Sequence, residues 1–179
     1  MTVAADDPSI MAGRERYEGP AGPVNAYVVW PAKAQARRGA VVVIHENRGL
    51  NPYIEDVTRR LAVAGFVAFG PDALFPLGGY PGTDDAGRTL QATRNGAEML
   101  EDFIAAVKLM QAHPDCTGKV GIVGFCFGGG ICNNVAVRVP STSGQFAHVT
   151  ATQSREVQDW TWRLLACSEG CFTGRWSDQ

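Results

Sequence analysis

The chain has 179 residues, of which 45% are hydrophobic and 19% are charged, and its net charge at pH 7 is −2. These values predict a globular chain with a sizeable core, and they exclude a strongly basic surface for nucleic acid or an anionic membrane. No apolar run approaches the roughly 20 residues that span a bilayer, and residues 1–8 lack the pattern of a signal peptide.

The chain has an odd number of cysteines, five, and no C-x-x-C pair. This argues against a disulfide framework and against a zinc site. The cysteines are Cys116, Cys126, Cys132, Cys167 and Cys171. A reducing cytoplasm is therefore the predicted location, and neither a metal nor a cofactor is expected.

The first half of the chain predicts the order strand, strand, helix, strand, at residues 24–30, 40–44, 52–64 and 66–69. The valine-rich run at 40–44 is typical of a strand that is covered on both faces. Asn51 is suited to cap the free amides of the helix, Pro52 is tolerated at its first position, and Gly65 ends it.

The second half predicts a long loop, a helix, a strand and a helix, at residues 71–96, 97–113, 120–123 and 127–139. The loop is rich in glycine and leaves room for a short helix, and long loops in compact domains are often binding loops. Strands that alternate with helices imply an α/β fold with a mainly parallel sheet and right-handed crossovers.

A change in composition near Pro140 divides the chain. Ser9 is the single serine of residues 1–140, whereas residues 141–179 hold five serines and three of the four tryptophans, and no strand pattern follows Val139. We therefore expect residues 1–140 to be the N-terminal part of the domain. Residues 141–179 are expected to be an atypical tail that is frame-shifted, truncated or disordered, with a plain surface extension as the alternative.

The segment from Lys119 to Gly130 carries the strongest chemical signal. It places Gly124, Cys126 and Gly128 in a G-x-C-x-G pattern between a predicted buried strand and a predicted helix, which is the context of a nucleophile elbow. Small residues are needed on both sides of a nucleophile on so sharp a turn, and the amides of the following helix favour an anion. A buried cysteine in a glycine-rich turn is the alternative.

Nucleotide binding is not predicted. The glycines at 121, 124, 128, 129 and 130 do not fit the G-x-G-x-x-G pattern, and neither a ribose-binding acid nor a Walker lysine is present. The sharp turn therefore explains these glycines better than a phosphate site does.

The segment from His45 to Asn51 directly follows the strand at 40–44. In the sheet of an α/β-hydrolase this loop supplies the second donor to the oxyanion. We expect His45 to be a strand-end histidine with a satisfied ring. For Glu46 and Arg48, a solvated pair of loop charges is the alternative to a functional role.

Three segments, at residues 45–56, 78–82 and 124–130, together resemble the dienelactone hydrolase (carboxymethylenebutenolidase) family of α/β-hydrolases. The resemblance covers about residues 24–140, which correspond to the front part of the family's domain. It implies hydrolysis of a small-molecule ester or lactone through a thioester acyl-enzyme.

The resemblance also implies roles for individual residues. Cys126 matches the nucleophile, and Glu46 matches a loop glutamate that interacts with the thiol and helps to activate it. The backbone amides of Asn47 and Phe127 would form the oxyanion hole. The candidates for binding a substrate carboxylate are the loop arginines Arg48 and Arg88.

The family's triad acid and histidine follow the nucleophile in chain order, and neither is identifiable here. After Cys126 the single histidine is His148, which has no strand context. Two further hypotheses therefore stay open: a non-catalytic remnant of such an enzyme, and a thiol redox or binding protein built on Cys126 and Cys132. The oligomeric state is not predicted.

Overall fold

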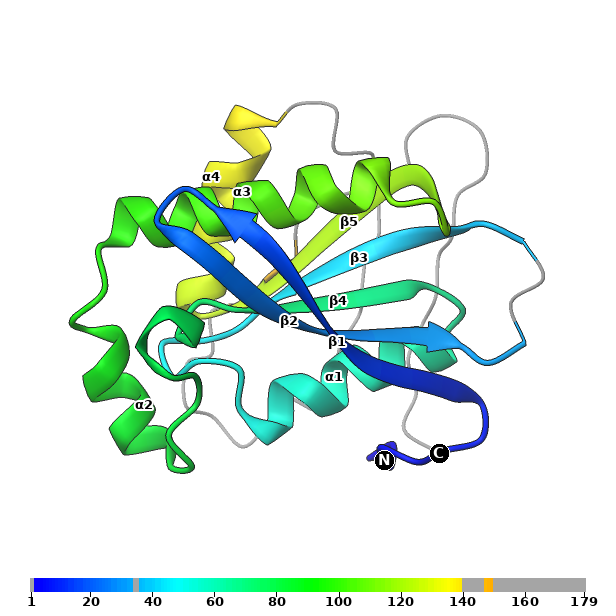
Figure 1. Cartoon of the computed structure of the whole chain (residues 1–179), viewed down its shortest axis with the longest axis horizontal. Coiled ribbons are helices and arrows are strands. Elements are labelled where there is room, and N and C mark those ends of the chain that lie inside the picture. Colours follow the sequence, from blue (N-terminus) through cyan, green and yellow to red (C-terminus); the bar gives the residue numbers. More distant parts are fainter. Residues whose placement is uncertain (1, 34–35, 140–146, 150–179) are drawn as a thin grey trace.

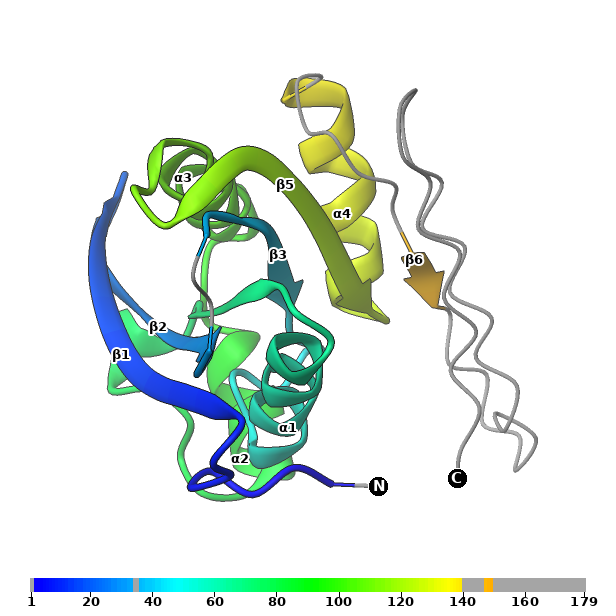
Figure 2. The same cartoon turned by 90° about the vertical axis from the view of Figure 1, so that its right-hand side faces the viewer.

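The computed structural model of the protein describes residues 2–33, 36–139 and 147–149. In this part of the chain, helices flank a six-stranded sheet with the strand order β1-β2-β4-β3-β5-β6 (Figure 1 and Figure 2). None of the helices described there is long and apolar enough to cross a membrane. The elements are β1 (Ile10–Gly19), β2 (Gly22–Pro31), β3 (Arg38–Ile44), α1 (Pro52–Val63), β4 (Val67–Asp72), the 3-10 helix η1 (Phe75–Leu77), α2 (Asp84–Gln91), α3 (Gly96–Ala112), β5 (Cys116–Phe125), α4 (Phe127–Arg138) and β6 (Ala147–Val149).

The sheet is mixed. β3 lies between β4 and β5 and pairs with both in parallel, and β5 pairs in parallel with β6. β1 and β2 form an antiparallel hairpin, and β2 continues the sheet antiparallel to β4. The predicted α/β fold with a parallel centre is therefore confirmed, and the hairpin adds an antiparallel edge.

Alternate residues of the central strands contribute to two separate cores. On one face of the sheet, Val42 and Ile44 belong to a cluster with side chains of α3 and α4, Phe103 among them. On the other face, Val41 and Val43 belong to a cluster with side chains of α1. The valine-rich run of β3 is explained by this double burial, because both of its faces are covered by helices.

Helix α1 begins and ends as the sequence predicts. The Asn51 side chain accepts a hydrogen bond from the Ile54 N–H at 3.1 Å, and Pro52 occupies the first position. Gly65 follows the helix with a φ of 98°, a left-handed conformation that glycine adopts freely. The loop before α1 is therefore joined to a helix whose start is fixed by its own cap.

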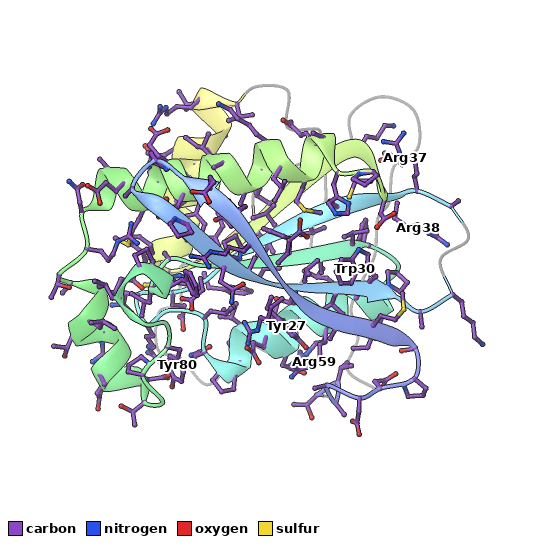
Figure 3. The ribbon with its side chains drawn as sticks, viewed as in Figure 1. Tyr27, Trp30, Arg37, Arg38, Arg59 and Tyr80 are labelled. Atoms are coloured by element: carbon purple, nitrogen blue, oxygen red, sulfur yellow. The ribbon has the colours of Figure 1, made fainter. Side chains whose placement is uncertain are left out.

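The N-terminal segment is fastened to α1. The Val3 N–H donates to Asp56 at 2.7 Å, and Arg59 Nε donates to the Val3 carbonyl at 2.6 Å. The Arg59 guanidinium also lies over the ring of Tyr27, 5.8 Å from its centroid (Figure 3). These contacts join the N-terminus, α1 and β2, and so hold the antiparallel edge against the centre of the sheet.

Two elements that precede Val139 differ from the sequence predictions. Strand β1 is not predicted, because Ile10 and Tyr17 are its only buried residues and the apolar alternation is too weak to detect. Residues 71–96, predicted as a loop with room for a short helix, hold both η1 and α2. Within α3, Asp102 is buried and pairs with Arg94 at 2.9 Å.

The short strand β6 lies beyond Val139, where the sequence predicts no strand. Its backbone pairs with β5, and His148 is the register partner of Gly124. The expectations for the rest of the tail, at 140–146 and 150–179, lie outside the described residues.

Candidate active site

The loops that follow β3, β4 and β5 lie at one edge of the sheet, because these parallel strands end on the same side. Ile44 of β3 is the register partner of Gly124 of β5. Glu46 and Cys126 each follow these partners by two residues. The structure therefore brings the 45–51 loop and the turn at Cys126, which are distant in sequence, to neighbouring positions.

Cys126 lies on the turn between β5 and α4 and has a strained backbone, with a φ of 51° and a ψ of −110°. It is the one non-glycine residue with a positive φ among those that the structure describes. Its carbonyl accepts a hydrogen bond from the Gly129 N–H at 3.0 Å, and the residue is exposed. This geometry is that of a nucleophile elbow, and it presents the thiol at the start of a helix.

Gly124 and Gly128 have no space for a side chain. A Cβ at Gly124 would lie 2.3 Å from the Gly128 carbonyl oxygen, and a Cβ at Gly128 would lie 2.4 Å from the Ile44 carbonyl oxygen. The first turn of α4 therefore contacts both β5 and the end of β3 directly. Gly130 faces open space, so steric crowding does not explain its choice.

His45 is fully buried, and both of its ring nitrogens have partners. Nδ1 lies 2.6 Å from the Glu46 carbonyl oxygen, and the Ala73 N–H donates to Nε2 at 3.2 Å. Because Nε2 accepts, Nδ1 carries the proton and donates it to the carbonyl. Burial lowers the pKa of His45 to about 4, so the ring is neutral at pH 7. The expectation of a satisfied strand-end histidine is confirmed.

The two predicted oxyanion donors follow neighbouring strands at the same edge of the sheet, Asn47 after β3 and Phe127 after β5. Asn47 is partly buried in the loop after β3, next to the partly buried Glu46. Phe127 is the first residue of α4, where backbone N–H groups have no partner within the helix. The structure thus places the four predicted groups at one edge of the sheet, with no hydrogen bond between the Glu46 carboxylate and the Cys126 thiol in its described residues.

The two arginines predicted to bind substrate have different surroundings. Arg48 Nη1 pairs with Asp84 Oδ2 at 2.8 Å, and its side chain is 34% exposed. Its Nε is buried and has no hydrogen-bond partner in the described part of the chain. Arg88 is exposed on α2 and pairs with Asp85 at 3.3 Å. Arg48, which lies in the same loop as Glu46, is therefore bound to α2 through Asp84. Arg88 faces solvent.

Sequence reasoning missed the contribution of α2 to the site. The helix begins after Thr83, whose hydroxyl accepts a hydrogen bond from the Ala86 N–H at 3.3 Å. A threonine followed by two acidic residues, Asp84 and Asp85, is a recognised sign of a helix start. This signal was available within the glycine-rich segment that the sequence predicts as a loop.

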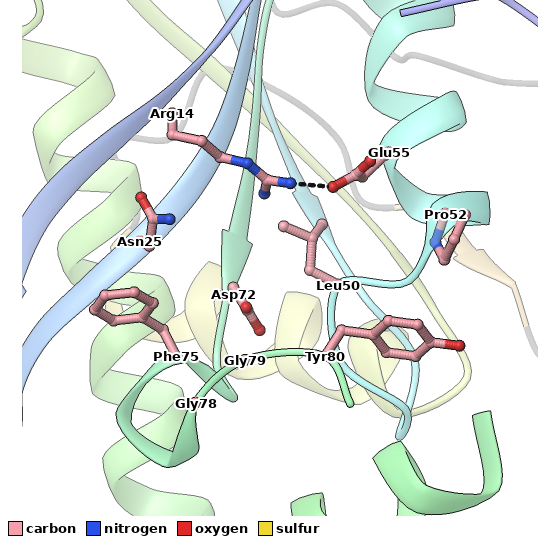
Figure 4. A pocket seen from close by; sticks show the side chains of 10 residues that line it. All are labelled: Arg14, Asn25, Leu50, Pro52, Glu55, Asp72, Phe75, Gly78, Gly79 and Tyr80. Atoms are coloured by element: carbon pink, nitrogen blue, oxygen red, sulfur yellow. Dashed lines mark hydrogen bonds and ion pairs between the residues drawn. The ribbon is translucent and has the colours of Figure 1, made fainter. Parts of the chain in front are cut away.

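A cavity of about 410 Å³ lies at the same edge of the sheet, beside the end of β4 (Figure 4). Its walls come from β1, β2, the start of α1 and the loops after β3 and β4, and Arg14 and Glu55 form an ion pair in them. Asp72 also lines it, and burial raises the pKa of this carboxyl to about 6. Sequence reasoning missed Asp72, although its place directly after Gly70 and Pro71 at a strand end could have drawn attention to it.

The three cysteines that the structure describes are free, and they differ in burial. Burial raises the pKa of the Cys116 thiol to about 11 and that of the Cys132 thiol to about 12. Cys126 is the exposed one. Within the described ranges, no group of three or more side chains is arranged to hold a metal ion.

The sheet, the flanking helices and the turn at Cys126 define an α/β-hydrolase. Brefeldin A esterase, described as a bacterial homologue of human hormone sensitive lipase, shares this fold with a TM-score of 0.59 at 19% identity, over 78% of this chain and 38% of that chain. The sequence model of the dienelactone hydrolase family matches residues 24–159. The chain belongs to the dienelactone hydrolase family, and the predicted resemblance is confirmed.

Individual relatives agree with this assignment. A protein of Escherichia coli (strain K12) that is named as a hydrolase fragment, YghX, is 58% identical over 91 residues, which are 50% of this chain and 78% of that protein. The carboxymethylenebutenolidase of Pseudomonas sp. (strain P51) is 33% identical over 125 residues, which are 64% of this chain and 50% of that protein. Among solved structures, the dienelactone hydrolase-like promiscuous phosphotriesterase P91 from metagenomic libraries is 31% identical with a TM-score of 0.63, over 75% of this chain and 56% of that chain. The chain spans about half the length of most curated relatives that it matches.

Proposed function

We propose that the protein hydrolyses carboxylic ester or lactone bonds in small molecules, with Cys126 as the nucleophile. The observation that carries the proposal is the exposed thiol on the strained turn at the end of β5, in a chain of the dienelactone hydrolase family. The similarity to a carboxymethylenebutenolidase supports an ester or lactone as the substrate class.

The proposed reaction begins when the Cys126 sulfur attacks the carbonyl carbon of the substrate. Glu46 accepts the thiol proton, and the new C–S bond leaves a tetrahedral oxyanion that the N–H groups of Asn47 and Phe127 hold. Collapse of this intermediate breaks the C–O bond, and the leaving alkoxide takes up the proton. Water then adds to the resulting thioester, which releases the carboxylic acid and restores the thiol.

Neither histidine side chain that the structure describes is suited to activate this water. His45 is buried with both ring nitrogens engaged. His113 follows α3 and lies before β5 begins, at the opposite edge of the sheet, 3.8 Å from Glu15. The described residues are therefore assigned to the acylation step.

The proposal is tested with p-nitrophenyl acetate, by the release of p-nitrophenolate and by mass spectrometry of the acetylated peptide. The wild-type protein is expected to form an acetyl thioester at Cys126 and to continue releasing p-nitrophenolate after the first equivalent, whereas Cys126→Ala is expected to do neither. Cys116→Ser is the matched control, because its thiol is buried, and it is expected to acylate as the wild type does. Glu46→Gln is expected to slow acylation by about 10²-fold, as loss of a general base does. Acylation that persists in Cys126→Ala would refute the proposal.

The same assay distinguishes the other hypotheses from the sequence. A non-catalytic remnant would give one burst of acylation without turnover. A thiol redox protein that uses Cys126 and Cys132 is disfavoured, because Cys132 is buried and its pKa is raised to about 12. A cytoplasmic location is proposed together with the activity, because free thiols persist in a reducing compartment.

A further inference from the structure

We propose that His45 and α2 together fix the orientation of the peptide between Glu46 and Asn47, so that the Asn47 N–H is held in position for the oxyanion. The inference deepens the proposed function and rests on it, because it assigns positioning residues to the same site. His45 acts from the β3 side of the loop, and Asp84 acts from the α2 side.

The His45 ring holds the peptide through its carbonyl. A trans peptide is planar, and its C=O and N–H point in opposite directions, so fixing the Glu46 carbonyl also fixes the direction of the Asn47 N–H. His45 Nδ1–H donates to that carbonyl at 2.6 Å. The ring is itself held by the Ala73 N–H at 3.2 Å and by an edge contact with Phe103, with 5.5 Å between the ring centroids.

Asp84 holds the other end of the loop with three hydrogen bonds. Its carboxylate accepts from Arg48 Nη1 at 2.8 Å, from Asn51 Nδ2 at 3.1 Å and from the Tyr80 hydroxyl at 2.9 Å. The hydrogen bonds from Asn51, Arg48 and Tyr80 keep the pKa of Asp84 below its usual value, so it is ionised at neutral pH. One side chain of α2 therefore restrains two residues of the loop and one residue of the segment before α2.

Two more residues on the same face of α2 contact the loop. A Cβ at Gly87 would lie 2.2 Å from the Arg48 carbonyl oxygen, so the helix backbone and the loop backbone are in direct contact. Gln91 Oε1 accepts a hydrogen bond from the Gly49 N–H at 3.1 Å. Positions 84, 87 and 91 share one side of a helix. Their common target is the loop, which makes α2 a support for it.

The two supports enclose the peptide that carries the proposed oxyanion donor. Its own carbonyl is bound by His45, and the next residues, Arg48 and Gly49, are bound by α2. A donor that is not fixed in this way would lose part of its effect, since displacement of a reacting group by about 1 Å can cost on the order of 10²-fold in rate.

The experiment compares Asp84→Ala with Asp85→Ala, which removes a charge from the same turn of α2 but only an exposed ion pair with Arg88. Two rates are measured at Cys126: acylation by p-nitrophenyl acetate, which needs the oxyanion donor, and alkylation by iodoacetamide, which does not. Asp84→Ala is expected to slow acylation about 10-fold and to leave alkylation within about twofold of the wild type, since only acylation develops an oxyanion. Asp85→Ala is expected to change neither rate.

His45 is tested by a conservative rescue, because its loss from a buried position destabilises the fold. His45→Asn keeps an N–H donor near the position of Nδ1, whereas His45→Ala keeps none. The asparagine variant is expected to acylate faster than the alanine variant when both rates are divided by the rate of alkylation. Equal ratios for the two variants would overturn the role of His45.

Equal acylation by Asp84→Ala and Asp85→Ala would overturn the role of α2, and so would an equal loss of acylation and alkylation in Asp84→Ala. Failure of the proposed function is a separate result: the wild type would then show no acylation that depends on Cys126. In that case amide hydrogen exchange of peptides that cover 46–51 still decides the question. Faster exchange in Asp84→Ala than in Asp85→Ala supports the inference, and equal exchange refutes it.

Discussion

Replacement of Cys126 by glycine is expected to make the protein more stable while it removes the thiol. At a φ of 51° and a ψ of −110°, a residue with a Cβ is strained and glycine is not. Strain of this kind costs on the order of 1–3 kcal/mol. Glycine also increases the entropy of the unfolded chain, which lowers the free energy of unfolding by about 0.5–1 kcal/mol. The expected net gain in stability is therefore about 1 kcal/mol.

The matched comparison is with Cys126→Ala, which removes the sulfur but keeps the Cβ. Urea unfolding, followed by tryptophan fluorescence, gives the free energy of unfolding of both variants by linear extrapolation. A gain of 1 kcal/mol corresponds to about 2–4 °C in Tm for a chain of this size. If the glycine variant is no more stable than the alanine variant, the turn at 126 is not strained, and the elbow loses its physical basis.

Gly128→Ala is expected to lower the free energy of unfolding by about 1–3 kcal/mol, because its Cβ would lie 2.4 Å from the Ile44 carbonyl oxygen. Gly130→Ala, at a helix position that faces open space, is expected to raise it by up to about 1 kcal/mol. Urea unfolding that ranks the two variants the other way would contradict the packing of this turn. The pH dependence of stability is expected to reflect two opposed groups. Burial raises the pKa of Asp72 from 3.8 to about 6. Its contribution to stability is therefore complete below pH 3.8 and is lost as the pH rises through 6. Burial lowers the pKa of His45 from 6.5 to about 4. Its contribution to stability is therefore complete above pH 6.5 and is lost as the pH falls through 4. Asp72→Asn is therefore expected to be more stable than the wild type by up to about 3 kcal/mol at pH 8 and by nearly nothing at pH 4, and a difference that is constant between these pH values would refute the assignment.

The parts of the fold and the site that follow from local sequence are predictable. Three features each follow from a local physical requirement. The valine-rich run of β3 reflects burial of both faces, the Asn51 cap reflects the free amides at the start of α1, and the glycines beside Cys126 reflect close approach of the backbone. These features were sufficient to predict the parallel centre and the turn that carries the thiol. The catalytic roles of the site residues and the division of the chain at residue 140 stay predictions.

The rest depends on partners that are distant in sequence. Strand β1 is held mainly by its hairpin with β2, because few of its own side chains are buried. The contact between Asp84 and Arg48 joins residues 36 positions apart, and neither residue alone indicates the other. Asp72 has a raised pKa because the surrounding elements bury it, and no local pattern around it specifies that burial.

The register between β3 and β5 links the stability of the sheet to the geometry of the proposed reaction. A slip of one residue would move the thiol by about 3.3 Å along the strand relative to the 46–47 peptide, and it would turn alternate side chains to the opposite face. Because those side chains belong to two different cores, a slipped sheet would lose its packing as well as its site. A sequence that keeps this sheet folded therefore also keeps Cys126, the proposed nucleophile, aligned with the 46–47 peptide.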